Sequence, residues 1–291
     1  MRRRGRHPVI ARPLPRDSCQ GCRLPARTRA LPRAALASAL ALAGSLALAC
    51  AALRETRLER DHGRERAQER QVVALPAGAV DYDAEVRPIL AARCVVCHAC
   101  YDAPCQLKLG SSAGIDRGGN TDEVYDALRL RQADPTRLFE DAATTTAWRS
   151  KNFHPVLNER RQSREQNREG SVLYQLLALK RANPLAPGTL LPADIDLRLR
   201  HDEQCPTLAE LPRHIRKHPG WGMPYGLPAL DEREHQLITR WLEEGARQRP
   251  PAPLPPADIA QIAAWEAFLN RDSLKARLAA RYIYEHLFLA H

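Results

Sequence analysis

The sequence has little methionine, no clear strand pattern and almost no net charge outside its first residues. Only two methionines occur in 291 residues, and because one of them is Met1, Met223 is the sole candidate for a functional thioether. No run alternates β-branched with polar residues, so we expect a mainly α fold with long irregular loops. The net charge is +10, but residues 1–33 hold ten Arg and one Asp, which leaves +1 for the rest. This distribution argues against a basic face for DNA or RNA, and we expect no nucleic-acid partner.

The basic segment leads into residues 34–53, an uncharged run of Ala, Leu, Ser, Gly and one Cys. A positive segment followed by an apolar one predicts an export signal, and a run of this length also permits a membrane anchor. Cys50 follows the small residues Ala47 and Ala49 and leaves a lipoprotein open as well. We therefore expect a periplasmic protein, with signal cleavage, anchoring through residues 34–53 and lipid attachment at Cys50 as open alternatives.

Composition and periodicity divide the remainder into three parts. Residues 54–78 are dense in Arg and Glu and predict a polar spacer. Residues 79–249 have the periodicity of a globular domain, and residues 250–291 form a Pro-rich linker with an incomplete helical region. Periodicity and capping signals predict helices around Leu90, over 121–132, 136–148 and 171–182, from Thr207, from Asp231 to Gly245, and from Asp258 and Ser273. The last helix stays apolar up to His291, so we expect the chain to be the N-terminal part of a longer protein.

The most informative motif is Cys94-Val95-Val96-Cys97-His98. Two cysteines spaced C-x-x-C can add across the two vinyl groups of a haem, and the histidine that follows is placed to bind the iron. The motif therefore predicts covalent haem c on Cys94 and Cys97, with His98 as the proximal axial ligand. Covalent haem attachment takes place outside the bacterial cytoplasm, so the export signal and the motif support each other. The cytochrome c maturation machinery is the expected partner during biogenesis.

The same cysteines allow two rival interpretations. Cys94, Cys97, Cys100 and Cys105 are spaced C-x2-C-x2-C-x4-C, close to an iron–sulfur run but with one residue more before the fourth cysteine. A zinc site is the second rival, and it would leave the histidine of the motif without a role. Under the haem interpretation Cys100, Cys105 and Cys205 remain, and two of them could form a disulfide outside the cytoplasm. The sequence does not choose the pair.

The distal side of the iron needs a second ligand, for which Met223 is the candidate. It lies in the turn-rich segment Trp221-Gly222-Met223-Pro224-Tyr225-Gly226, ahead of the helix that begins at Asp231. In small c-type cytochromes the distal methionine occupies such a loop, before a C-terminal helix whose aromatic residue, here Trp241, packs on the N-terminal helix. The long stretch between Cys97 and Met223 predicts a cytochrome c-like domain with a substantial insertion. The rival ligands are His154, His201, His214 and His218.

Longer strings of the sequence resemble one family. Residues 94–109 (CVVCHACYDAPCQLKL) are similar to the haem segment of the bacterial fatty acid cis/trans isomerases. The resemblance continues through PTRLFEDA at 135–142, FHPVLNER at 153–160, WGMPYGLP at 221–228 and the helix over 232–246. It covers roughly residues 80–291, and strings of this length are far more specific than C-x-x-C-H alone. Members of the family are considerably longer than this chain.

The resemblance implies an enzyme that converts cis double bonds in the acyl chains of membrane phospholipids to trans, which stiffens the membrane under stress. It implies an electrophilic haem iron that weakens the π bond in a redox-neutral reaction, and methionine ligation raises the iron potential. Because Met223 would fill the sixth position, either it dissociates for substrate or the alkene reacts at the porphyrin edge. No catalytic residue beyond the haem iron is predicted. The alternatives are an electron-transfer c-type cytochrome domain without lipid chemistry and a redox or ligand sensor.

Overall fold

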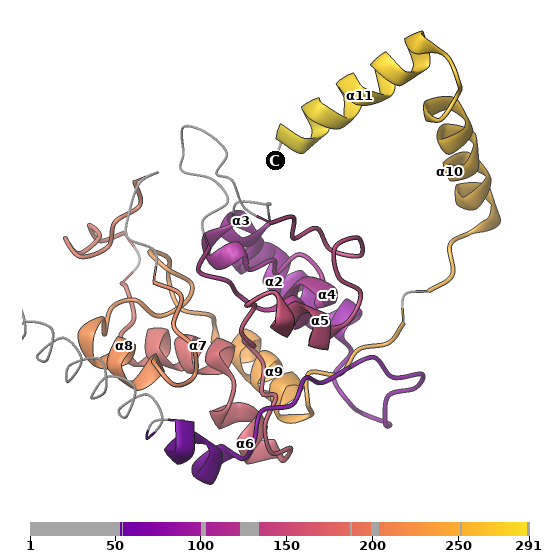
Figure 1. Cartoon of the computed structure of the whole chain (residues 1–291). Helices are drawn as coiled ribbons and strands as arrows, with labels where there is room; N and C mark the ends of the chain where they lie inside the picture. Colours follow the sequence, from indigo (N-terminus) through magenta and orange to yellow (C-terminus); the bar gives the residue numbers. More distant parts are fainter. Residues whose placement is uncertain are drawn as a thin grey trace, which may run out of the picture. The chain divides into compact units, whose positions relative to one another are not determined.

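The computed structural model describes residues 53, 55–99, 103–122, 134–186, 188–198, 204–250 and 252–289. All of them belong to one unit, Ala51–His291, and the predicted signal or anchor over 34–53 lies almost wholly outside the described residues. In chain order the elements are η1 (Tyr82–Val86), α2 (Arg87–Arg93), α3 (Val95–His98), η2 (Pro104–Gln106), α4 (Ser112–Arg117), α5 (Thr145–Ser150), α6 (Arg164–Glu169), α7 (Val172–Ala182), α8 (Leu211–Lys217), α9 (Glu232–Glu243), α10 (Pro256–Leu269) and α11 (Leu274–Leu289) (Figure 1).

Short helices and irregular connections make up the described part of the chain. It contains isolated β-bridges but no strand, which confirms the mainly α prediction. Side-chain caps explain where many of these helices begin, because an oxygen at the N-cap accepts a hydrogen bond from an otherwise unpaired backbone N–H of the first turn. Such caps are made by Ser111, Thr144, Ser163, Ser171 and Asp231.

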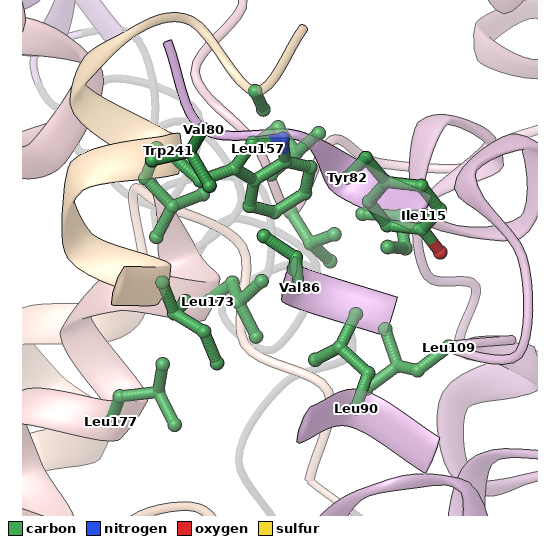
Figure 2. Packing of buried hydrophobic residues seen from close by; sticks show 14 residues of the cluster. Val80, Tyr82, Val86, Leu90, Leu109, Ile115, Leu157, Leu173, Leu177 and Trp241 are labelled. Carbon is green, nitrogen blue, oxygen red and sulfur yellow. The ribbon is translucent and has the colours of Figure 1, made fainter. Parts of the chain in front are cut away.

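The hydrophobic core joins the N-terminal helical segment to α7 and α9 (Figure 2). Val86 and Leu90 come from η1 and α2, at 0% and 1% exposed, and Ile238 and Trp241 come from α9, at 0% and 2%. The ring of Trp241 packs on the ring of Tyr82, with 5.6 Å between the centroids. The prediction that Trp241 packs against the N-terminal helix is therefore confirmed. Because α2 is part of this core, the core fixes the position of the turn that follows α2.

Several predicted helices are confirmed together with the signals that predicted them. Helix α7 spans Val172–Ala182 within the predicted 171–182, and α10 and α11 follow the linker as expected. Helix α9 begins with a complete capping box, in which Asp231 accepts from the backbone of Glu234 and Glu234 accepts from the backbone of Asp231. It ends at Glu243, and Gly245 two residues later has a φ of +92°, in the region that glycine adopts without a steric penalty.

Two predicted helices are shorter than the sequence suggested. The helix predicted over 136–148 is only α5, because the carboxylate of Asp141 binds the backbone N–H of Arg137 at 2.6 Å and Phe139 adopts a φ of +69°. The helix predicted from Thr207 begins at Leu211. There the Thr207 hydroxyl donates to Glu210 at 2.9 Å instead of accepting from its backbone N–H, so the capping box is incomplete. The helix predicted over 121–132 lies almost entirely outside the described residues.

The residues of the predicted polar spacer contact the body of the unit. Helical residues 55–62 are followed by an extended stretch in which the backbone N–H of Val72 donates to Gln248 at 2.9 Å. The guanidinium of Arg70, 6% exposed, binds Asp116 at 3.0 Å. A backbone hydrogen bond and an ion pair therefore attach the polar segment to the rest of the unit.

No helix in the described ranges combines the length and the apolar character needed to cross a membrane.

Candidate functional site

The two cysteines and the histidine of the motif lie on one helical turn at the end of α2. The backbone N–H of Cys94 donates to Leu90 at 2.9 Å, and those of Cys97 and His98 donate to Cys94 at 3.1 and 3.0 Å. Residues separated by three or four positions share one side of a helix, so Cys97 and His98 both neighbour Cys94 on this turn. Neither cysteine is in a disulfide, and Cys94 packs against the core while Cys97 is exposed. The core contacts of α2 therefore fix the position of the motif.

His98 is buried and its ring is oriented by the backbone. Its side chain is 8% exposed, and Nδ1 lies 3.0 Å from the carbonyl oxygen of Leu107. Because a carbonyl only accepts, Nδ1 carries the proton and Nε2 keeps a lone pair. Burial lowers the pKa of His98, and the hydrogen bond to Leu107 partly opposes this shift. A neutral, oriented imidazole is the form of histidine that binds a metal ion.

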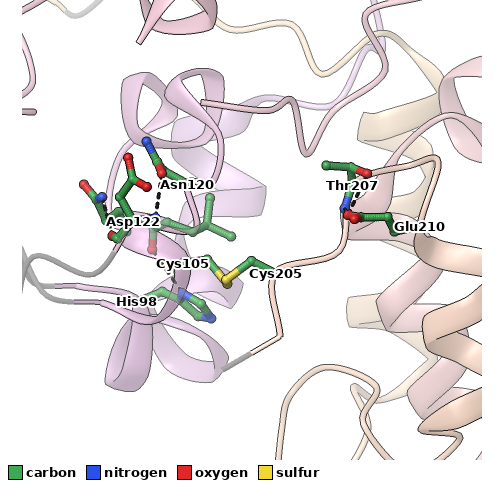
Figure 3. Close-up of a disulfide and its surroundings, with 9 residues drawn as sticks. His98, Cys105, Asn120, Asp122, Cys205, Thr207 and Glu210 are labelled. Carbon is green, nitrogen blue, oxygen red and sulfur yellow. Dashed lines mark hydrogen bonds between the residues drawn. A yellow bond between two sulfur atoms is a disulfide. The ribbon is translucent and has the colours of Figure 1, made fainter. Parts of the chain in front are cut away.

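The loop that orients His98 is tied to a distant part of the chain by a disulfide (Figure 3). Cys105 bonds to Cys205 across 100 positions of sequence, just before the segment that leads into α8. Cys105 lies in η2, and the carbonyl of Leu107 follows directly after this element. The structure thus selects one of the pairs that the sequence left open.

The disulfide argues against the four-cysteine cluster. Cys105 cannot offer a thiolate while it is bonded to Cys205, and Cys100 lies outside the described residues. Burial raises the pKa of the Cys94 thiol from 9.0 to about 11, so the free thiol is protonated at neutral pH. Within the described ranges, no group of three or more His, Cys, Asp and Glu side chains is arranged to hold a metal ion. The iron–sulfur interpretation as the sequence posed it, with Cys105 as fourth ligand, is therefore wrong.

Met223 lies in the loop before α9, and this loop packs tightly against α7. The backbone N–H of Met223 donates to Leu176 at 2.9 Å, and its side chain packs against the same core cluster as Cys94. Gly222 approaches α7 so closely that a Cβ at this position would lie 2.2 Å from the backbone nitrogen of Lys180. Only glycine permits this approach. The structure thus brings Cys94 and Met223 against one core.

The rival histidines have different surroundings. His154 belongs to an irregular segment whose backbone pairs with Gly119, and burial lowers its pKa. His214 and His218 of the α8 region gather around Trp221, where the His218 ring stacks on the indole at 3.9 Å between centroids. His201 lies outside the described residues.

Lys180 was not predicted as a site residue from the sequence. Lys180 is 1% exposed, and its Nζ has no hydrogen-bond partner among the described residues. The signal was present, because positions 173, 176, 177 and 180 follow the spacing of one helix face, and the first three are leucine. The helical spacing therefore places a lysine on the apolar face of this helix.

The sequence model of one family, fatty acid cis/trans isomerase (CTI), matches residues 133–291, which is more than half of the chain. The match includes Lys180 and Met223 and begins after the Cys94–His98 turn. Among curated proteins and among solved structures, no match to the chain was found. The match confirms the resemblance seen in the sequence: this chain belongs to the fatty acid cis/trans isomerase family and is an isomerase.

Proposed function

We propose that this isomerase carries a covalent haem c and converts cis double bonds in phospholipid acyl chains to trans. The observation that supports the haem most directly is the Cys94–His98 turn, where two unpaired cysteines neighbour a buried histidine. The hydrogen bond from Nδ1 of His98 to the Leu107 carbonyl leaves Nε2 as the ligand atom. These residues fit the group that the motif implies.

Each of these residues has a distinct task in the proposal. Cys94 and Cys97, whose thiols are free, would each add S–H across a vinyl group of the haem to form a thioether link. His98, whose ring is held by Leu107, would be one ligand of the haem iron, and Met223 would be the other. A bound haem would supply electrophilic chemistry that weakens the π bond of an alkene without net redox change. The protein positions the residues proposed to hold the haem, because the core holds α2, α7 and the Met223 loop together.

The proposal includes export to the periplasm. The disulfide supports this part, because such bonds persist in oxidising compartments and are rare in the cytosol. The basic segment and residues 34–53 supply the export signal, and the cytochrome c maturation machinery attaches the haem after export. Membrane phospholipids, whose acyl chains are the substrate, are then within reach.

The test combines haem attachment with product analysis. The full chain is produced with the maturation machinery and incubated with vesicles of a cis-unsaturated phospholipid, and trans acyl chains are quantified by gas chromatography. We expect product from the wild type and from His286→Ala, an exposed histidine in α11. We expect none from Cys94→Ala or His98→Ala. Equal product from haem-free protein would reject the role of haem, and a haem protein that transfers electrons without trans product would favour the cytochrome alternative.

A further inference from the structure

The amine of Lys180 is a buried cation for which the described residues supply no counter-ion. The side chain is 1% exposed, and Nζ has no hydrogen-bond partner in the described part of the chain. Burial of an unpaired ammonium costs several kcal/mol, so proteins pair such groups with an anion or hold them neutral. Desolvation lowers the pKa of Lys180, which is the expected response when no partner is present.

The charged residue next to Lys180 in the sequence forms its contacts with α9. Arg181, the next residue, pairs with Glu232 at 2.7 Å and contacts Nδ1 of His235 at 3.0 Å. Both contacts lie on the α9 side, and Glu232 and Arg181 are each half exposed. Lys180 therefore differs from Arg181, because its amine is buried and meets no carboxylate among the described residues.

Lys180 lies beside the loop that contains Met223, the proposed distal ligand of the candidate site. Its backbone lies directly against Gly222, the residue before Met223, and Leu176 one turn earlier accepts from the Met223 N–H. Helical side chains lean toward the N-terminus of their helix, which for Lys180 is the direction of Leu176 and of the Met223 backbone bonded to it. The unpaired amine thus belongs to the same part of α7 as the proposed distal ligand.

We propose that Lys180 is a cofactor-binding residue whose ammonium pairs with a propionate of the haem. The inference rests on the proposed function, because it takes the haem to lie between the Cys94–His98 turn and the Met223 loop. A propionate is an anion that the polypeptide does not supply, and it would give Nζ the charge-assisted hydrogen bond that it lacks. The same contact would couple the loop of Met223 to the edge of the haem.

The experiment measures the haem rather than catalysis. Lys180→Met removes the buried charge with little change of shape, Lys180→Arg retains the charge, and Lys217→Met is the matched control at an exposed position of α8. The midpoint potential is measured by spectroelectrochemistry, and the propionate bending band by resonance Raman spectroscopy. Loss of a cation beside the haem favours the ferric state, so we expect Lys180→Met to shift the reduction equilibrium about tenfold, a fall of about 59 mV for one electron.

The outcomes separate this inference from the function. We expect the propionate bending band to shift in Lys180→Met and to keep its wild-type position in Lys180→Arg and in Lys217→Met. The methionine-to-iron band should be intact in all three variants. Unchanged potential and Raman band in haem-loaded Lys180→Met would overturn the pairing and leave the proposed function standing. A change in the axial-ligand bands would overturn it in favour of Lys180 as an iron ligand. Wild-type protein without covalent haem would overturn both proposals.

Discussion

The disulfide between Cys105 and Cys205 should make a large contribution to stability, because it closes a very long loop. The bonded residues are 100 positions apart, and a cross-link restricts the unfolded chain more as the loop grows. The chain-entropy relation gives about 4.7 kcal/mol at 25 °C for a loop of this length. Domains are typically stable by about 5–15 kcal/mol, so loss of the bond would remove a third or more of the total.

Urea denaturation of four proteins tests this estimate: the wild type, Cys105→Ser, Cys205→Ser and the double variant. Each substitution breaks the same link, so all three variants should lose the same free energy of unfolding, about 4–5 kcal/mol. Reductant should destabilise the wild type by that amount and leave Cys205→Ser unchanged. The reasoning would be refuted by a loss below about 1 kcal/mol, or by a reactive Cys205 thiol in the oxidised, denatured wild type.

Three further predictions concern the core, the Met223 loop and the buried charges. Leu90→Ala should lower the free energy of unfolding by about 2–5 kcal/mol, while Leu274→Ala, at a side chain 81% exposed, should change it by less than about 0.5 kcal/mol in the same urea titration. Gly222→Ala should displace the loop from α7, since the new Cβ would lie 2.2 Å from a backbone nitrogen, and the methionine-to-iron absorption band should weaken or disappear; an unchanged band would show that the close approach of Gly222 to α7 does not position Met223. Burial raises the pKa of Asp116 from 3.8 to about 6, so the folded protein retains a proton that the unfolded chain releases, and stability should fall as the pH rises through that window. Asp116→Asn should flatten this fall, which is on the order of 3 kcal/mol, in urea titrations from about pH 4 to pH 7; a parallel pH profile would count against the shift.

The sequence predicted those features that depend on neighbouring residues. The capping box of Asp231 and Glu234, and the apolar stripe of α7, are local signals, and both helices formed where they were expected. The packing of Trp241 on the N-terminal helix was also expected, from the place of the corresponding aromatic residue in small c-type cytochromes. The clustering of Cys94, Cys97 and His98 follows directly from their spacing.

Features that depend on distant residues were not predictable in the same way. The pairing of Cys105 with Cys205 follows from how the chain returns to the motif, which no local pattern encodes. Thr207 and Glu210 have the right residue types for a capping box, but only one of its two bonds forms: Glu210 accepts from the Thr207 backbone N–H, while the Thr207 hydroxyl donates to Glu210. The apolar stripe of α7 places Lys180 on the buried face of the helix. The lack of a hydrogen-bond partner for its amine depends on the surrounding loops, about which the stripe carries no information.

The most direct test of this account is the intact mass and the visible spectrum of the protein purified from a host with haem maturation. We expect one covalently bound haem in the wild type, retained after denaturation and acid extraction, and its loss in the Cys94→Ala/Cys97→Ala variant. A wild-type mass equal to that of the bare polypeptide, together with full trans-isomerising activity, would contradict it.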